Sequence, residues 1–141
     1  MPVTDRLTAV DEISANPGFA HAVTVSGRVA FVSGQVAQDA GGQLVGAGDL
    51  RAQTVQAMTN LHRIIRELGA DWPDVARFGW YMLDAGQVQV VRDVRDELIG
   101  PVLGGKPNPA STLVQVAALF RPEFLVEVDA VVALPGTWQD G

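Results

Sequence analysis

Two amphipathic helical segments, separated by one short apolar stretch, constrain the fold of this chain more than any other feature. The first covers residues 50 to 68, where apolar side chains recur every three or four positions along one face. Asp49 precedes it as an N-cap, and Gly69 follows it as a C-terminal stop. The residues expected on the inward face are Leu50, Thr54, Ala57, Leu61, Ile64 and Leu68, with Met58 and Ile65 beside them.

The second helical segment follows residues 75 to 84, an apolar stretch that predicts a buried strand. Asp84 and Gln87 have the spacing of a capping box, which predicts that the helix begins there. Gly100-Pro101 predicts where it ends. The residues expected to face inward are Val88, Val91, Val94 and Leu98.

Strand-like segments flank these helices. Residues 21 to 37 predict a hairpin, because two β-rich runs flank the turn dipeptide Ser26-Gly27. Residues 111 to 119 and 124 to 133 predict two further strands. The order β-β-α-β-α-β-β has no repeat or linker and favours one domain over residues 1–141. It predicts the α+β class, a single mixed β-sheet with two helices packed on one face, and we expect another subunit to cover the apolar second face.

The composition disfavours several classes of function. Of the 141 residues, 48% are apolar and 18% are charged, which is typical of a globular protein. A net charge of -6 and the absence of a basic run disfavour nucleic acid as a partner. The chain has no cysteine, which removes disulfides and thiolate chemistry. We see neither a signal peptide nor an apolar run of the roughly 18 residues that span a membrane, so we expect a cytoplasmic protein without a membrane partner.

The sequence gives no support for a metal site, a phosphate-binding loop or a catalytic triad. His21 and His62 each lack a nearby partner at ligand spacing, so we expect no metal site. The loop of residues 104 to 109 lacks the sequence of a phosphate-binding loop and the helix that follows one. Ser33 and Ser111 have no neighbouring base in the sequence.

The last predicted strand carries two carboxylates in an apolar run. Glu127 and Asp129 are two residues apart, so both point to the same side of an extended chain. A charge in such a strand lowers the stability of the fold by several kcal/mol unless it is paired or hydrated, and a functional role is a further reason for its presence. One interpretation is an exposed acidic stripe on an edge strand. The other is a partly buried pair with raised pKa values, which would suit a general base or acid near neutral pH. Periodicity leaves both open.

Specific motifs resemble the YjgF/RidA family, which is also called endoribonuclease L-PSP. They are Ser33-Gly34-Gln35, the Gln53-Thr54 pair near the first helix start, and the segment Glu127-Val128-Asp129-Ala130. The resemblance extends from about Gly18 to Leu134 in the family's order and spacing.

This resemblance implies a chorismate-mutase-like fold of the bacillus type, a homotrimer, and ligand clefts between subunits. Well-known members hydrolyse reactive imines and enamines, such as 2-iminopropionate and 2-aminoacrylate, to a keto acid and ammonia without a cofactor. Glu127 stands where the family has a glutamate that positions and activates water. The positions that the resemblance places at the cleft as substrate-binding residues are Ala20, Ser33, Gly34, Arg92, Ser111, Thr112 and Leu113.

Several of these positions depart from the family pattern. Ser111 replaces the family's carboxylate-binding arginine, Leu113 replaces a cysteine, and Ala20 replaces a tyrosine. Arg92 replaces an asparagine of the second helix, with Arg95 one turn further on. We expect Arg92 either to supply the missing positive charge or to form a surface pair with Asp96.

Three functions remain open from the sequence alone. The first, which we favour, is a cofactor-independent hydrolase of a small imine, enamine or related C–N compound, with a substrate other than 2-aminoacrylate. The second is a non-catalytic trimer that binds a metabolite or acts like a chaperone. The third is the ribonuclease activity of the older family label, which the acidic charge and the lack of a histidine pair disfavour.

Overall fold

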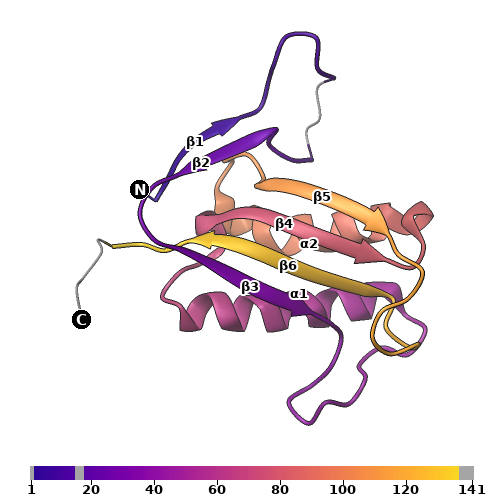
Figure 1. The fold of residues 1–141 in the computed structure, drawn as a ribbon. Helices are drawn as coiled ribbons and strands as arrows, with labels where there is room; N and C mark the ends of the chain where they lie inside the picture. Colours follow the sequence, from indigo (N-terminus) through magenta and orange to yellow (C-terminus); the bar gives the residue numbers. More distant parts are fainter. Residues whose placement is uncertain (1, 15–17, 137–141) are drawn as a thin grey trace.

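A mixed sheet of four strands, with two helices on one side, forms the body of the fold (Figure 1). The computed structural model describes residues 2–14 and 18–136. The strand order is β3-β6-β4-β5; β4 and β5 are parallel, and β6 is antiparallel to both of its neighbours. The elements of this body are β3 (Val29–Gln35), α1 (Leu50–Glu67), β4 (Val75–Met82), α2 (Val88–Leu103), β5 (Ala110–Gln115) and β6 (Val126–Ala133). Figure 1 places both helices behind the sheet, so the predicted α+β class is confirmed.

The first helix begins and ends where the sequence predicts. The Asp49 carboxylate accepts a hydrogen bond from the Ala52 amide at 3.0 Å, which satisfies one of the unpaired N–H groups at the helix start. Beyond the end, Gly69 adopts a positive φ of 81°, which glycine accepts without steric cost. Seven α1 residues are buried, among them Ala57, Met58 and Leu61 at 0% exposure.

Alternation along the strands separates a helix-facing side from an open side. In β6, Val126, Val128, Ala130 and Val132 are at most 3% exposed and belong to the core under the helices. The intervening Glu127, Asp129 and Val131 are half-buried on the open side. Phe31 of β3 pairs with Val131 in register and is 83% exposed, so the open side carries a large uncovered apolar group.

The predicted hairpin over residues 21 to 37 is wrong. Both strands exist, but β2 (Ala22–Val25) pairs with an unpredicted N-terminal strand, β1 (Val3–Leu7), in a separate two-stranded sheet, while β3 pairs with β6. Gly27, with a φ of 81°, redirects the chain between them. Side-chain alternation shows that a segment is extended, whereas the identity of its partner depends on distant parts of the chain.

Both predicted ends of the second helix need correction. Asp84 caps a single 3-10 turn, η2 (Ala85–Gln87), by accepting from the Gly86 amide at 2.9 Å, and α2 itself begins at Val88. At the other end Pro101 lies inside the helix, which continues to Leu103. Gly104, in the left-handed conformation, then ends it. Pro101 is exposed, so water can hydrate the carbonyl that its missing N–H leaves unpaired.

Within the described residues, no helix has the length and apolar character that crossing a bilayer requires. The same residues contain no group of three or more His, Asp or Glu side chains arranged to hold a metal ion.

Candidate functional site

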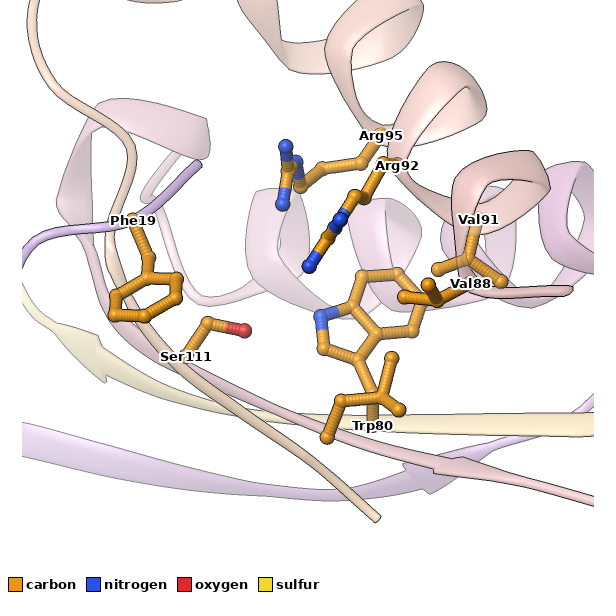
Figure 2. A pocket seen from close by; sticks show the side chains of 8 residues that line it. Phe19, Trp80, Val88, Val91, Arg92, Arg95 and Ser111 are labelled. Carbon is orange, nitrogen blue, oxygen red and sulfur yellow. The ribbon is translucent and has the colours of Figure 1, made fainter. Parts of the chain in front are cut away.

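A small pocket lies between α2 and the β4–β5 end of the sheet. Its cavity holds about 60 Å³, which restricts any enclosed group to a few heavy atoms. Figure 2 shows two arginines of α2 extending toward a tryptophan and a serine of the sheet, with a phenylalanine across from them. The lining residues are Phe19, Trp80, Val88, Val91, Arg92, Arg95, Ser111 and Leu113.

Strand register explains why the sheet residues of the pocket face the helices. Ser111 of β5 pairs with Phe78 of β4, and Leu113 pairs with Trp80. Phe78 and Trp80 belong to the core under α1 and α2, so their β5 partners point to the same side. Ala20, another predicted cleft residue, bridges to Ala110 and is 1% exposed; its neighbour Phe19 lines the pocket instead.

The pocket contains two cations in different settings. Arg95 is buried, with 8% of its side chain exposed, and both its Nε and Nη2 lie 2.9 Å from Oδ1 of Asp96. Arg92 is exposed overall, and among the described residues it has neither a hydrogen bond nor an ion pair. The surface pair of Arg92 with Asp96 is therefore wrong, because Asp96 pairs with Arg95 instead.

These groups give the pocket the chemistry of a small-anion site. In Figure 2 the indole nitrogen of Trp80 and the hydroxyl of Ser111 point toward the guanidinium of Arg92. A guanidinium can bind a carboxylate through two parallel hydrogen bonds, and both hydroxyl and indole N–H can donate a third. The sequence did not predict Trp80 or Phe19 as site residues, because the sequence pattern does not distinguish an aromatic residue of a pocket from one of the core. Arg95, one turn from Arg92, had no role that the sequence could assign.

The carboxylate of Glu127 lies on the opposite side of the sheet. It is half-buried and packs directly over Gly34, where an added Cβ would lie 2.6 Å from Glu127 Cδ. A register shift between Val32 and Gln35 brings this glycine under the side chain. Among the described residues no donor hydrogen-bonds to Glu127. Burial, and then the charge of Asp129, raise the pKa of Glu127 above its usual value.

The carboxylate of Asp129, unlike that of Glu127, has polar partners on the neighbouring strand. The Tyr81 hydroxyl donates to its Oδ2 at 2.8 Å, and Nη1 of Arg77 lies 3.9 Å from its Oδ1. Gly79 stands opposite Asp129 in the β4–β6 register and leaves room for the carboxylate. The two acidic side chains therefore share a face, as predicted, but only one of them is held by neighbours.

Apart from the buried Ala20, the sequence-predicted site residues divide into two sets on opposite sides of one sheet. Ser111 and Leu113 join Arg92 in the pocket on the helix side. Gly34 and Glu127 lie together on the open side, and the exposed Thr112 pairs with Gly79 on that side too. Ser33, adjacent to Gly34, is exposed. Within one chain the two sets do not meet.

The structure is that of a small α+β protein with an arginine-containing pocket on one side of the sheet and a half-buried carboxylate on the other. Residues 9–134 match the model of the endoribonuclease L-PSP family. A RutC family protein of Synechocystis is 30% identical over 106 residues, covering 74% of this chain and 78% of that protein. The 2-iminobutanoate/2-iminopropanoate deaminase of Bos taurus is 32% identical over 114 residues, covering 80% and 77%.

A solved structure agrees with these relatives. The crystal structure of a Rid family protein from Yersinia pestis superposes with a TM-score of 0.79 at 35% identity, covering 92% of this chain and 98% of that one. The chain therefore belongs to the endoribonuclease L-PSP family, also known as YjgF/RidA.

Proposed function

We propose that this protein is a cofactor-independent hydrolase of a small imine or enamine that carries a carboxylate, and that it works in clefts between the subunits of a homotrimer. The bovine relative, named as a deaminase of 2-iminobutanoate and 2-iminopropanoate, supports the reaction class. Because Ser111 stands where the resemblance places a carboxylate-binding arginine, we propose a preferred substrate other than 2-aminoacrylate.

The observation that carries this proposal is the separation of the two half-sites. The Glu127 carboxylate and the Arg92 pocket lie on opposite sides of the same sheet. They can act on one molecule only if the open side of one copy meets the pocket of another. Such an association would also cover the exposed side chain of Phe31 on the open side.

Arg92 supplies the substrate's carboxylate contact in this proposal. It extends from α2 into the pocket that Ser111 lines, and it has no partner among the described residues. A helix-borne arginine thus takes over the charge that the family places on the neighbouring strand. The small cavity suits a carboxylate head group, with the reacting carbon toward the mouth of the pocket.

Glu127 acts as the base in the proposed reaction. It accepts a proton from water as the water oxygen bonds to the carbon of the C=N group, and it then passes that proton to the imine nitrogen to give a carbinolamine. The carbinolamine loses its hydroxyl proton to the nitrogen as the C–N bond breaks, which releases ammonia and leaves a keto acid. The raised pKa of Glu127, caused by burial and then by Asp129, makes the carboxylate a better proton acceptor near neutral pH. Water is the only co-reactant.

The experiment is to follow ammonia and keto acid release from freshly generated 2-iminopropanoate and 2-iminobutanoate. Wild-type protein is expected to accelerate release, and Glu127→Gln, which is nearly isosteric but cannot take the proton, is expected to lose at least 10²-fold in rate while keeping its oligomeric mass. If a panel of small imino acids binds but none is hydrolysed faster than in buffer, the metabolite-binding alternative replaces the hydrolase. A fully active Glu127→Gln protein would remove Glu127 from the mechanism.

A further inference from the structure

The two carboxylates of the open sheet side have unequal surroundings. Asp129 accepts a hydrogen bond from the Tyr81 hydroxyl at 2.8 Å, and the Arg77 guanidinium lies within 3.9 Å of its other oxygen. Glu127 has no hydrogen-bond donor among the described residues. In the register, Glu127 stands opposite Tyr81 and Asp129 opposite Gly79, so the tyrosine reaches Asp129 along the diagonal.

Gly79 makes this arrangement sterically feasible. A Cβ at position 79 would lie 3.1 Å from Cγ of Asp129 and 3.2 Å from Nη1 of Arg77, and it would overlap an oxygen of the carboxylate. The Asp129 carboxylate therefore lies directly over the β4 backbone, between the side chains of Arg77 and Tyr81. Its position is defined by three residues of the neighbouring strand.

We propose that Tyr81 is a positioning residue that holds and stabilises the Asp129 carboxylate, so that Glu127 is the carboxylate of the pair that is left to take up a proton. Two nearby carboxylates disfavour each other's ionised form, and the one whose anion is better stabilised remains ionised. A donated hydrogen bond and a nearby guanidinium stabilise the Asp129 anion. The use of Glu127 as a base rests on the proposed function, but the difference between the two titrations does not.

The remaining groups on this side agree with the assignment. Besides Asp129, the titratable groups facing Glu127 come from β4, namely Arg77 and Tyr81, while β3 and β5 contain no charged residue. The hydrogen bond to Asp129, and then burial, raise the pKa of the Tyr81 hydroxyl, which therefore stays protonated and able to donate. Burial, and then Asp129, raise the pKa of Glu127.

The test is a carboxyl-carbon NMR titration of the whole protein without substrate, with the Glu127 and Asp129 signals assigned from Glu127→Gln and Asp129→Asn. In wild type, Glu127 is expected to have the higher midpoint. Tyr81→Phe removes only the donor and is expected to raise the Asp129 midpoint by about one pH unit, the equivalent of one hydrogen bond to a charged group. Thr59→Val is the matched control, since its hydroxyl bonds a carbonyl of α1 on the other side of the sheet, and it should leave both midpoints unchanged.

The outcomes separate this inference from the proposed function. A higher midpoint for Asp129 than for Glu127 in wild type, or unchanged midpoints in Tyr81→Phe, would overturn it. Asp129→Asn should lower the Glu127 midpoint because a like charge is removed; no change there would show that the pair is uncoupled and would also overturn it. An inactive protein with the expected titration contradicts the proposed function alone, and an active one with equal midpoints contradicts this inference alone.

Discussion

Substituting Gly34 by alanine tests how strictly the position of Glu127 matters. A Cβ at residue 34 would lie 2.6 Å from Cδ and 2.9 Å from Cγ of Glu127, distances below 3.0 Å that real Cβ atoms essentially never show. Positive φ occurs at several glycines of the described chain but not at Gly34, so its backbone accepts alanine. The strain therefore falls on the Glu127 side chain, which must rotate away from its present position.

The expected cost to stability is small and the expected cost to activity is large. Glu127 is only half-buried, and its outer atoms can move toward solvent. The free energy of unfolding should therefore fall by only about 1 kcal/mol, the low end of the cost of an overpacked site. A displaced base, in contrast, forfeits the 10²- to 10⁴-fold that general base catalysis typically contributes. We expect Gly34→Ala to lower kcat/KM for imine hydrolysis by about 10²-fold or more.

The assay compares kcat/KM and urea unfolding for wild type, Gly34→Ala and the control Gly100→Ala. Gly100 lies in α2, is exposed, and has no atom within 4 Å of an added Cβ, so alanine there should stabilise the helix by up to about 1 kcal/mol and leave activity unchanged. Gly34→Ala with wild-type kcat/KM would refute the reasoning. So would a further rate loss when Gly34→Ala is added to Glu127→Gln, because the glycine would then act through something other than Glu127.

Other consequences can be measured separately. Light scattering at micromolar concentration should give about three times the 14.9 kDa of one chain, and a clean monomer would contradict the intersubunit cleft. Arg92→Gln should weaken carboxylate binding by about ten- to a hundredfold, the equivalent of one charged hydrogen bond, and unchanged affinity for every ligand found would exclude it from the pocket's chemistry. Ser111→Arg in an Arg92→Ser background should return the cation to β5 and recover hydrolysis that Arg92→Ser alone loses; no recovery would mean that the cation must come from α2. Gln53→Leu should lower the free energy of unfolding, measured in urea, by about 3 kcal/mol or more. The side-chain amide of Gln53 is fully buried and makes three hydrogen bonds, which connect α1 to the loop at Gly46 and to the start of β6. A loss below about 1 kcal/mol would show that these bonds are easily replaced.

The local pattern of the sequence was sufficient for the elements themselves. Periodicity of 3.6 and a capping aspartate located α1 almost to the residue, and alternation in β6 correctly placed Glu127 and Asp129 on one side. The motifs around Ser33 and Glu127 were specific enough to indicate the family from residue types and spacing alone. Each of these signals is carried by residues that are close in the chain.

Which strands pair with one another was decided only by the tertiary structure. The strands on either side of Gly27 look like a hairpin, yet β2 joins the N-terminal strand and β3 joins β6. Pro101 looks like a helix end, yet an exposed proline in the last turn is tolerated because water can hydrate the carbonyl left without a donor. In both places the local signal is compatible with two structures; for the strands, pairing with distant parts of the chain selects one.

The candidate site also shows what the local sequence indicates and what only the tertiary structure decides. The resemblance selected positions 92, 111 and 127 as candidate site residues, but only the β4–β5 and β4–β6 registers show that Ser111 and Glu127 lie on opposite sides of the sheet. The hydrogen bond from Tyr81 to Asp129 and the pairing of Arg95 with Asp96 likewise become visible only when neighbouring strands and helix turns are assembled. Alternation assigns side chains to two faces within one strand, whereas the relative orientation of different strands depends on long-range packing, which the sequence pattern does not encode locally.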